Sequence, residues 1–218
     1  MRLVHQMLVA PAWAISPPAD GSRPGDFRKR GATIAGSRVR TTPVVAIEGV
    51  VADWTDKSTS SRDPSVHEIL HTADMHAWFE RIHPFADGNG RVGRLLLNFM
   101  LIQRGYPPAV FSSAQRERYL DALDRADGGS PRSLAEMTAR AIEMSLNRLL
   151  IPRLAGDARL VPLAALAEGT EYSPDYLRTL AVSGRLRAAR EGKIWLSSRA
   201  WLEEYREGRS SRGRRPSV

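Results

Sequence analysis

The chain has 218 residues, no cysteine and a formal net charge of +8 at pH 7. Its length suits one domain of ordinary size with a small second domain, and its 42% share of hydrophobic residues allows a real core. The lack of cysteine excludes disulfides and thiolate metal sites. No apolar run approaches the roughly 20 residues of a membrane-spanning helix, and Pro11 breaks the short N-terminal apolar stretch. We therefore expect a cytoplasmic protein that does not contact membranes.

The first 60 residues have a mixed character. We expect a helix to begin at Leu3–Leu8 and a Pro- and Gly-rich loop to follow from Ser16 to Gly25. The run Ala32–Arg40 carries β-branched residues on both sides of a Gly-Ser pair. This pattern predicts a small β-hairpin.

Residues 64–152 predict a series of helices. The first is expected to begin at Pro64, with Asp63 as its N-cap, and to end at Ile82 before Pro84. Apolar residues recur along it at helical spacing. The other expected helices span residues 91–102, 113–126 and 132–150.

The C-terminal part predicts shorter elements and carries most of the excess positive charge. A linker is expected at residues 153–159 and a small domain at residues 160–207. Within this domain we expect helices at 161–168, 173–182 and 198–205 and a hairpin around Glu191 and Gly192. Residues 208–218 are expected to form a basic, disordered tail. This charge suits a polyanion such as nucleic acid.

One segment between two predicted helices, His83–Arg94, combines small and charged residues as HPFADGNGRVGR. Its Gly88, Asn89 and Gly90 precede a helix N-terminus, where backbone N–H groups and the helix dipole together favour anions. Asp87 supplies the hard oxygen ligand that Mg²⁺ prefers when it also binds phosphates. The segment therefore predicts a magnesium–phosphate site.

Three basic side chains complete this predicted site. Arg91 and Arg94 lie three residues apart, so they share a helix face and can bind the outer phosphates. His83 ends the preceding helix and, with an ordinary pKa near neutrality, can remove a proton from an attacking hydroxyl. Together these groups predict phosphoryl or nucleotidyl transfer. The chain has no GxxxxGK[ST] motif, which excludes a P-loop protein.

His83–Arg94 resembles the Fic signature, HPFx[DE]GN[GK]RxxR, at every position. Pro24–Arg28 and Ile34–Ser37 resemble the segment that leads into the flap hairpin of that family, and Gly105–Pro108 and Tyr119 also fall at its usual positions. The resemblance covers roughly residues 3–150. It implies a mainly α-helical Fic-type domain at residues 1–152 with a small β-hairpin flap.

The resemblance also implies roles for individual residues. His83 would be the catalytic base, Asp87 the Mg²⁺ ligand and Arg94 the contact to the γ-phosphate. The α- and β-phosphates would be held by Gly88, Asn89, Gly90 and Arg91. The flap would border the nucleotide with Ser37, Arg38 and Val39, and Tyr119 would lie near the base. The implied activity is a protein adenylyltransferase that moves AMP from ATP, with Mg²⁺, to a Ser, Thr or Tyr hydroxyl of a protein substrate.

Two alternatives stay open for the N-terminal domain. One is an inactive domain that only binds nucleotide. The other is a zinc site, because His67–His71 matches H-E-x-x-H. That motif fixes only three positions, and no third histidine follows at metzincin spacing. We expect His67 and His71 to lie on the outer or subdomain-facing side of a helix instead.

Residues 160–207 resemble the small winged helix-turn-helix of excisionase-like and MerR-like domains. Ser173 is expected to be the N-cap of a recognition helix, and Trp195 and Trp201 to lie in the core. The residues expected to contact duplex DNA are Arg178, Arg187, Arg190 and Lys193. A winged fold that binds protein instead remains possible. The alternative function is a DNA-binding transcriptional regulator whose Fic domain senses or binds nucleotide.

Many Fic proteins are restrained by a glutamate in an [ST]-x-x-x-E-[GN] helix, which this chain lacks. Val44 and Ala164 stand where Ser or Thr would precede Glu48 and Glu168. The alternatives are an inhibitory partner that supplies the glutamate, loss of the restraint, or a truncated chain. Gly90, where kinase variants have lysine, argues against kinase activity.

Overall fold

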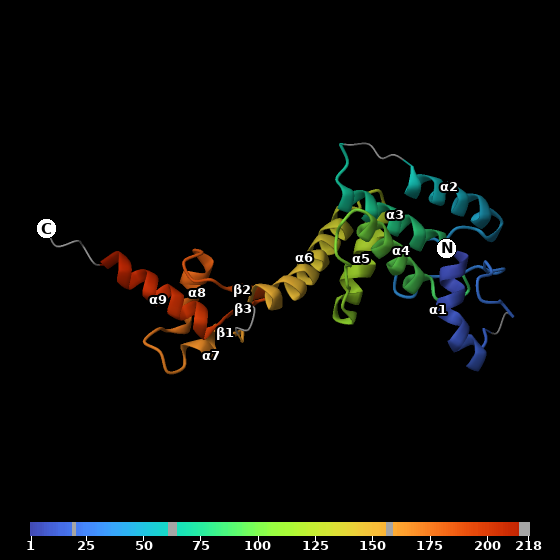
Figure 1. Cartoon of the computed structure of the whole chain (residues 1–218). Helices are drawn as coiled ribbons and strands as arrows, with labels where there is room; N and C mark the ends of the chain where they lie inside the picture. The colour runs from blue at the N-terminus through green and yellow to red at the C-terminus, as the bar shows by residue number, and fades with distance from the viewer. Residues whose placement is uncertain (19–20, 61–64, 156–158, 214–218) are drawn as a thin grey trace. The chain divides into compact units, whose positions relative to one another are not determined.

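The computed structural model describes residues 1–18, 21–60, 65–155 and 159–213, and it divides the chain into two compact units (Figure 1). The units are Met1–Ile142 and Glu143–Val218, and the division falls inside helix α6 (Arg132–Ala155). Residues 153–155 of the expected linker are therefore helical, and residues 156–158 lie outside the described part. Within the described part, no helix has the length and apolar character needed to cross a bilayer.

The described residues of the N-terminal unit form helices joined by loops. The helices are α1 (Arg2–Ile15), α2 (Ile47–Thr59), α3 (Glu68–Ile82), α4 (Asn89–Gln103), α5 (Arg116–Asp127) and the first part of α6, with short 3-10 turns η1 (Val44–Ala46) and η2 (Ser113–Gln115). Helix α3 packs against α2, α4 and α5, which makes it the central helix. Phe79, Ile82 and Phe85 are fully buried around it.

Two helix boundaries and one additional helix differ from the sequence-based expectations. Helix α1 continues past Leu8 to Ile15 although it contains Pro11. Helix α2 was not expected; the indole of its buried Trp54 donates to the Met75 carbonyl (2.8 Å). Helix α3 begins at Glu68 rather than Pro64, and residues 65–67 are not helical. Asp63 and Pro64 lie outside the described residues.

The expected β-hairpin at Ala32–Arg40 is wrong. Residues 31–43 are all described and contain no strand. The segment forms a tight turn in which the Ser37 N–H donates to the Ile34 carbonyl (3.0 Å), with Gly36 at a φ of 85°. Ala35, Ser37 and Arg38 form hydrogen bonds with helix α5, as described below.

The described part of the C-terminal unit contains the expected helices and hairpin in the expected order, together with a short strand at Val161–Pro162 where the first helix was expected to begin. The elements are β1 (Val161–Pro162), α7 (Leu163–Ala167), α8 (Pro174–Val182), β2 (Ala189–Glu191), β3 (Ile194–Ser197) and α9 (Arg199–Gly213). The strands are antiparallel in the order β1-β3-β2, with Arg190 opposite Trp195. The Ser173 hydroxyl accepts from the Tyr176 N–H, which confirms it as the N-cap of α8.

A leucine-rich cluster forms the core of this unit, and Leu166, Leu177 and Leu202 are among its buried members. Trp201 is 5% exposed and lies in the core, as expected. Helix α9 continues to Gly213, so the expectation of disorder from residue 208 is wrong for residues 208–213. Residues 214–218 lie outside the described part.

Candidate functional site

His83 ends helix α3 in an unusual backbone conformation. Its φ of 47° and ψ of 56° are left-handed, and no other non-glycine residue of the described chain has a positive φ. Such a conformation costs on the order of 1 kcal/mol and persists only where its surroundings impose it. The buried Arg28 imposes it here, because its guanidinium donates to the carbonyls of His83 (2.7 Å), Arg30 (2.7 Å) and Thr42 (2.5 Å).

The hydrogen bonds of the His83 ring define its proton-accepting atom. Its Nδ1 lies 3.2 Å from the Glu80 carbonyl. A carbonyl only accepts, so Nδ1 carries the proton and Nε2 of the neutral ring presents a lone pair. Burial lowers the pKa of His83, and the Arg28 cation lowers it further against the opposing effects of the Glu80 carbonyl and Asp87. The neutral, basic form of His83 therefore predominates at neutral pH.

Helix α1 holds the loop that follows His83. The Gly25 N–H donates to Nδ1 of the buried His5 (2.9 Å), so Nε2 of His5 carries the proton and donates to the Asp87 carbonyl (3.0 Å). The same ring stacks on Phe85 with centroids 3.8 Å apart. Gly88 has a φ of 82°, and a Cβ there would lie 2.9 Å from Val9. Gly88 is therefore required by its conformation and by close packing on α1.

Two residues expected to contact phosphate or metal have partners within the loop. The buried Asn89 amide donates to the Phe85 carbonyl and accepts from the Phe85 N–H, both at 2.8 Å. Its side chain thus fixes the turn, which leaves only its backbone N–H for an anion. Asp87 is exposed and pairs with Arg91 at 3.1 Å. Within the described chain, no group of three or more His, Cys, Asp or Glu side chains is placed to hold a metal ion.

A pocket of about 440 Å³ lies next to His83. Four of the predicted site residues line it: His83, Gly90, Arg94 and Tyr119. A Cβ on Gly90 would lie 3.2 Å from the Arg94 guanidinium, so that side chain crosses directly over the start of α4. From the expected flap, Ile34 lines this pocket, whereas Arg38 and Val39 line a separate pocket of about 280 Å³.

Tyr119 belongs to a buried polar network whose proton positions can be derived. Nδ1 of His76 lies 3.1 Å from the Gly93 carbonyl and must carry the proton, since that carbonyl only accepts. Nε2 of His76 therefore accepts from the Tyr119 hydroxyl, 2.8 Å away. The Tyr119 oxygen also hydrogen-bonds Glu80 and Arg94. Having given its proton to His76, the Tyr119 oxygen can accept from the Arg94 guanidinium.

The environment of Glu80 agrees with a neutral carboxyl. Burial raises the pKa of Glu80 to about 7, against the opposing effects of Arg94 and Tyr119. Its Oε1 is buried without a hydrogen-bond partner, and a Cβ on Gly93 would lie 2.3 Å from that atom. Burial also lowers the pKa of His76 to about 4. The pocket is thus backed by the neutral His76 ring and by a buried carboxyl that is hard to ionise, and the Arg94 cation acts on that carboxyl.

Sequence reasoning missed several residues that shape this site. His76, Glu80 and His83 are spaced to share one face of α3, and this periodicity could have revealed the first two. His5 and Arg28 gave no such signal, because the backbone groups of the signature that they bond, at Asp87 and His83, lie more than 50 residues away in the chain.

The H-E-x-x-H motif does not form a helical histidine pair. His67 precedes the first residue of α3, and its Nδ1 accepts the Ile69 N–H at 3.2 Å as the N-cap. A zinc site of this type needs both histidines on one helix face. The geometry around His67 therefore does not match that of a zinc protease.

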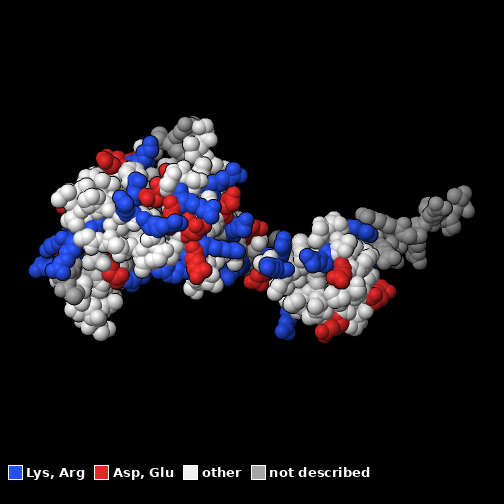
Figure 2. Space-filling view, turned by 180° about the vertical axis from the view of Figure 1, so that it is seen from behind, with Lys and Arg blue, Asp and Glu red and all other residues white. Residues whose placement is uncertain are grey.

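The basic residues predicted to contact DNA are all exposed on the C-terminal unit: Arg178, Arg187, Arg190 and Lys193. The Arg187 guanidinium lies 4.6 Å from the centroid of Trp201, and that of Arg190 lies 5.9 Å from Trp195. These two arginines therefore also contribute to packing. On the face shown in Figure 2, the Lys and Arg side chains of the N-terminal unit are interspersed with acidic ones.

Residues 1–101 match the Fic/DOC family. Among curated relatives, "Protein adenylyltransferase Fic" of Drosophila willistoni is 38% identical over 98 residues, which are 45% of this chain and 19% of that protein. The protein of the same name from Culex quinquefasciatus is 38% identical over 85 residues, covering 39% of this chain and 17% of its own. The matched region thus spans less than a fifth of the length of these relatives.

Solved structures share the fold. Fic-1 from C. elegans superposes with a TM-score of 0.59 at 24% identity, covering 71% of this chain and 43% of the other. A Fic family protein from Desulfovibrio desulfuricans G20 gives a TM-score of 0.52 at 18% identity, covering 90% of this chain and 67% of the other. The mainly helical architecture therefore has Fic-fold neighbours.

Proposed function

We propose that this chain is a protein adenylyltransferase, which transfers AMP from ATP to a Ser, Thr or Tyr hydroxyl of a protein substrate. The observation that carries the proposal is the neutral His83 ring, which lines a pocket together with Gly90 and Arg94. The similarity of the N-terminal region to proteins named protein adenylyltransferase Fic supports the same reaction.

In the proposed reaction, Nε2 of His83 takes the proton of the acceptor hydroxyl as its oxygen attacks the α-phosphorus of ATP. The bond from that phosphorus to the oxygen bridging toward the β-phosphate breaks, and pyrophosphate leaves with the electron pair. The backbone N–H groups at the start of α4, around Gly90, stabilise charge on the α- and β-phosphates. Arg94 binds the γ-phosphate with its forked donors.

Asp87 is the residue that would hold Mg²⁺ in this reaction. One exposed carboxylate fits this ion, because Mg²⁺ usually keeps several waters and takes its other ligands from substrate phosphates. The ion supplies neutralisation of phosphate charge when bound. The ion pair of Asp87 with Arg91 (3.1 Å) must open for this, which frees Arg91 to contact phosphate as well.

A second candidate function rests on the C-terminal unit. Its two helices α7 and α8 and the β2–β3 hairpin follow the order of a winged helix-turn-helix. Arg178 on α8 and Lys193 at the tip of the hairpin are exposed, as phosphate contacts would be. We propose duplex DNA as the partner of this unit, which would make the chain a DNA-binding regulator.

We also propose that an inhibitory protein that contacts Arg94 would restrain the transferase.

The position of the label in ATP tests the proposed reaction. We expect a cell lysate incubated with this chain, Mg²⁺ and ATP labelled at the α-phosphate to contain labelled protein. ATP labelled at the γ-phosphate should give none above the lysate alone, because that phosphate leaves within pyrophosphate. Transfer of the γ-label that depends on the added chain would indicate a kinase and contradict the proposal.

A further inference from the structure

The segment Ile34–Val39, here called the flap loop, is attached along one face of helix α5. Arg116 donates to the Ala35 carbonyl (3.1 Å), and a Cβ on Gly36 would lie 3.1 Å from Leu120. Residues four apart share a helix face, so the next contact along α5 is made by Asp124. Consecutive residues of the flap loop thus meet successive turns of α5.

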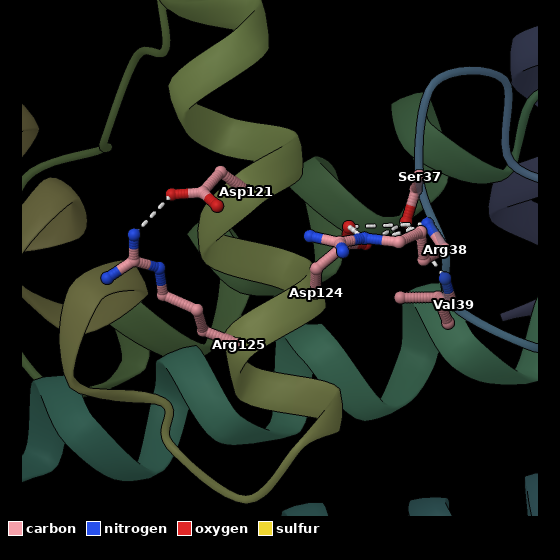
Figure 3. A network of polar contacts seen from close by, with 6 residues as sticks. All are labelled: Ser37, Arg38, Val39, Asp121, Asp124 and Arg125. Carbon is pink, nitrogen blue, oxygen red and sulfur yellow. Dashed lines mark hydrogen bonds and ion pairs between the residues drawn. The ribbon is translucent and has the colours of Figure 1, made fainter.

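Asp124 makes the largest share of these contacts. Figure 3 shows its carboxylate reaching from α5 to Ser37 and Arg38. It accepts hydrogen bonds from the Ser37 hydroxyl, the Arg38 N–H (3.0 Å) and Nε of Arg38 (3.4 Å). The Ser37 oxygen in turn accepts from the Val39 N–H (3.2 Å). One carboxylate therefore bonds the Ser37 hydroxyl and both the backbone and the side chain of Arg38.

The strength of this attachment comes from its hydrogen bonds more than from its ion pair. The Arg38 side chain is 90% exposed, so its charge contributes little, whereas the Asp124 side chain is only 15% exposed. The Ser37 hydrogen bond is the largest cause that lowers the pKa of Asp124, and the Arg38 contacts act in the same direction. The carboxylate is therefore ionised at neutral pH, and hydrogen bonds to an ionised acceptor are the stronger kind.

The attached loop is part of the pocket wall. Ile34 begins the flap loop and lines the pocket next to His83, opposite Arg116 and Leu120 from the α5 face that holds the loop. We propose that Asp124 is a positioning residue, which latches the flap loop to α5. The latch keeps Ile34 in the pocket wall, so that the pocket has the width that the nucleotide requires. That the ligand is ATP rests on the proposed function; the latch itself rests on the contacts above.

Asp124→Asn tests the latch, and Asp121→Asn is its matched control. Asp121 lies on the same helix, but its carboxylate pairs with Arg125 (2.9 Å) and does not contact the flap loop (Figure 3). Asparagine cannot accept all the donors that face Asp124. We expect Asp124→Asn to raise hydrogen exchange at the Arg38 and Val39 amides, and the KM for ATP, each by about threefold to tenfold. The kcat and the melting temperature should change little in Asp124→Asn. Asp121→Asn should leave amide exchange, KM, kcat and the melting temperature unchanged.

A double variant distinguishes loss of the Asp124 latch from a non-specific loosening of the flap loop. If Ser37 holds the flap loop only through Asp124, adding Ser37→Ala to Asp124→Asn should have little further effect on exchange at the Arg38 amide or on KM. The Val39 amide is left out of this comparison, because it donates directly to the Ser37 hydroxyl. Hydrogen exchange is measured without ATP, so it tests the latch even if the chain transfers no AMP. In that case the dissociation constant for ATP is measured in place of KM. Unchanged exchange in Asp124→Asn, or additive effects of the two substitutions, would overturn the latch. Faster exchange with unchanged KM and dissociation constant would overturn the positioning role.

Discussion

At the scale of single residues, three histidines of the N-terminal unit each have one defined proton position. His5 and His76 use both ring nitrogens in hydrogen bonds, whereas Nε2 of His83 remains available to a substrate. The sequence predicted His83 as the base from its place between two helices. It could not predict which nitrogen accepts the proton, because this depends on the Glu80 carbonyl and on the left-handed backbone that Arg28 holds.

The pH dependence of transfer should report the lowered pKa of His83. Its ordinary pKa is 6.5, and burial lowers it, so the neutral base persists to lower pH than in a free histidine. We expect kcat/KM to fall on acidification with a midpoint below 6.5, because kcat/KM follows the ionisation of the free enzyme. An acidic midpoint above that value would contradict the environment described for His83.

Glu80 should make its own contribution to the pH dependence of stability. Its pKa is raised from 4.5 to about 7 by folding, so the folded chain binds more protons than the unfolded one between these values. The contribution is therefore complete below about pH 4.5 and is lost as the pH rises through about 7. Glu80→Gln keeps a neutral side chain at all pH values. From pH 5 to 8, its free energy of unfolding should rise relative to the native chain by on the order of 2 kcal/mol.

Denaturant titrations of the two proteins at several pH values measure this difference. The histidines titrate in both proteins, so their contributions to the free energy of unfolding cancel in the comparison. A difference that stays constant with pH would show that Glu80 is ionised throughout this range and would contradict the effect of burial on its pKa.

At the scale of elements, the crossing of α3 and α4 organises the site. Apolar periodicity predicted both helices, and the signature predicted the loop between them. The start of α3 was misplaced because a histidine, His67, acts as its N-cap where the usual cap residues are Ser, Thr, Asp and Asn. The hairpin was predicted from β-branched residues, but local propensity yields to tertiary contacts, here those of Asp124 with the flap loop.

The close approach of α3 and α4 at Gly93 gives a prediction for stability. A methyl group there would lie 2.3 Å from Glu80 and 2.9 Å from Phe79, both buried. We expect Gly93→Ala to lower the free energy of unfolding by about 1–3 kcal/mol through overpacking. Gly49→Ala is the control, since a Cβ at this position of α2 meets nothing within 4 Å. It should be neutral or stabilising by up to about 1 kcal/mol. Equal unfolding energies for the two variants would contradict the tight crossing.

At the scale of the whole chain, the structure divides into two compact units. The change in element length and charge after residue 150 predicted the second unit, and its helices and hairpin lie close to their expected positions. The division inside α6 could not be predicted, because the helix continues past the point where its contacts with the first unit end. The ligand of the second unit stays a prediction.

DNA binding by the C-terminal unit predicts a salt-dependent affinity. Each phosphate contacted by Arg or Lys releases counterions, so Arg178→Ala with Lys193→Ala should shallow the slope of log K against log salt by about one per lost contact. These residues are better targets than Arg187, whose loss would also disturb packing on Trp201. Arg132→Ala on the N-terminal unit, where the side chain is 86% exposed, is the charge-matched control for either single change. Fluorescence titrations of duplex DNA over a salt series measure the slopes, and unchanged slopes in the double variant would contradict these contacts.

The measurement that tests the central claim most directly compares the native chain with His83→Ala. AMP transfer from α-labelled ATP to a protein hydroxyl and the affinity for Mg·ATP are measured on the same preparations. Loss of the base should reduce the transfer rate by about 10²–10⁴-fold, while ATP affinity should change little, because we propose that α4 and Arg94, not His83, bind the phosphates. Equal transfer rates in the two proteins would show that His83 is not the base and contradict the account.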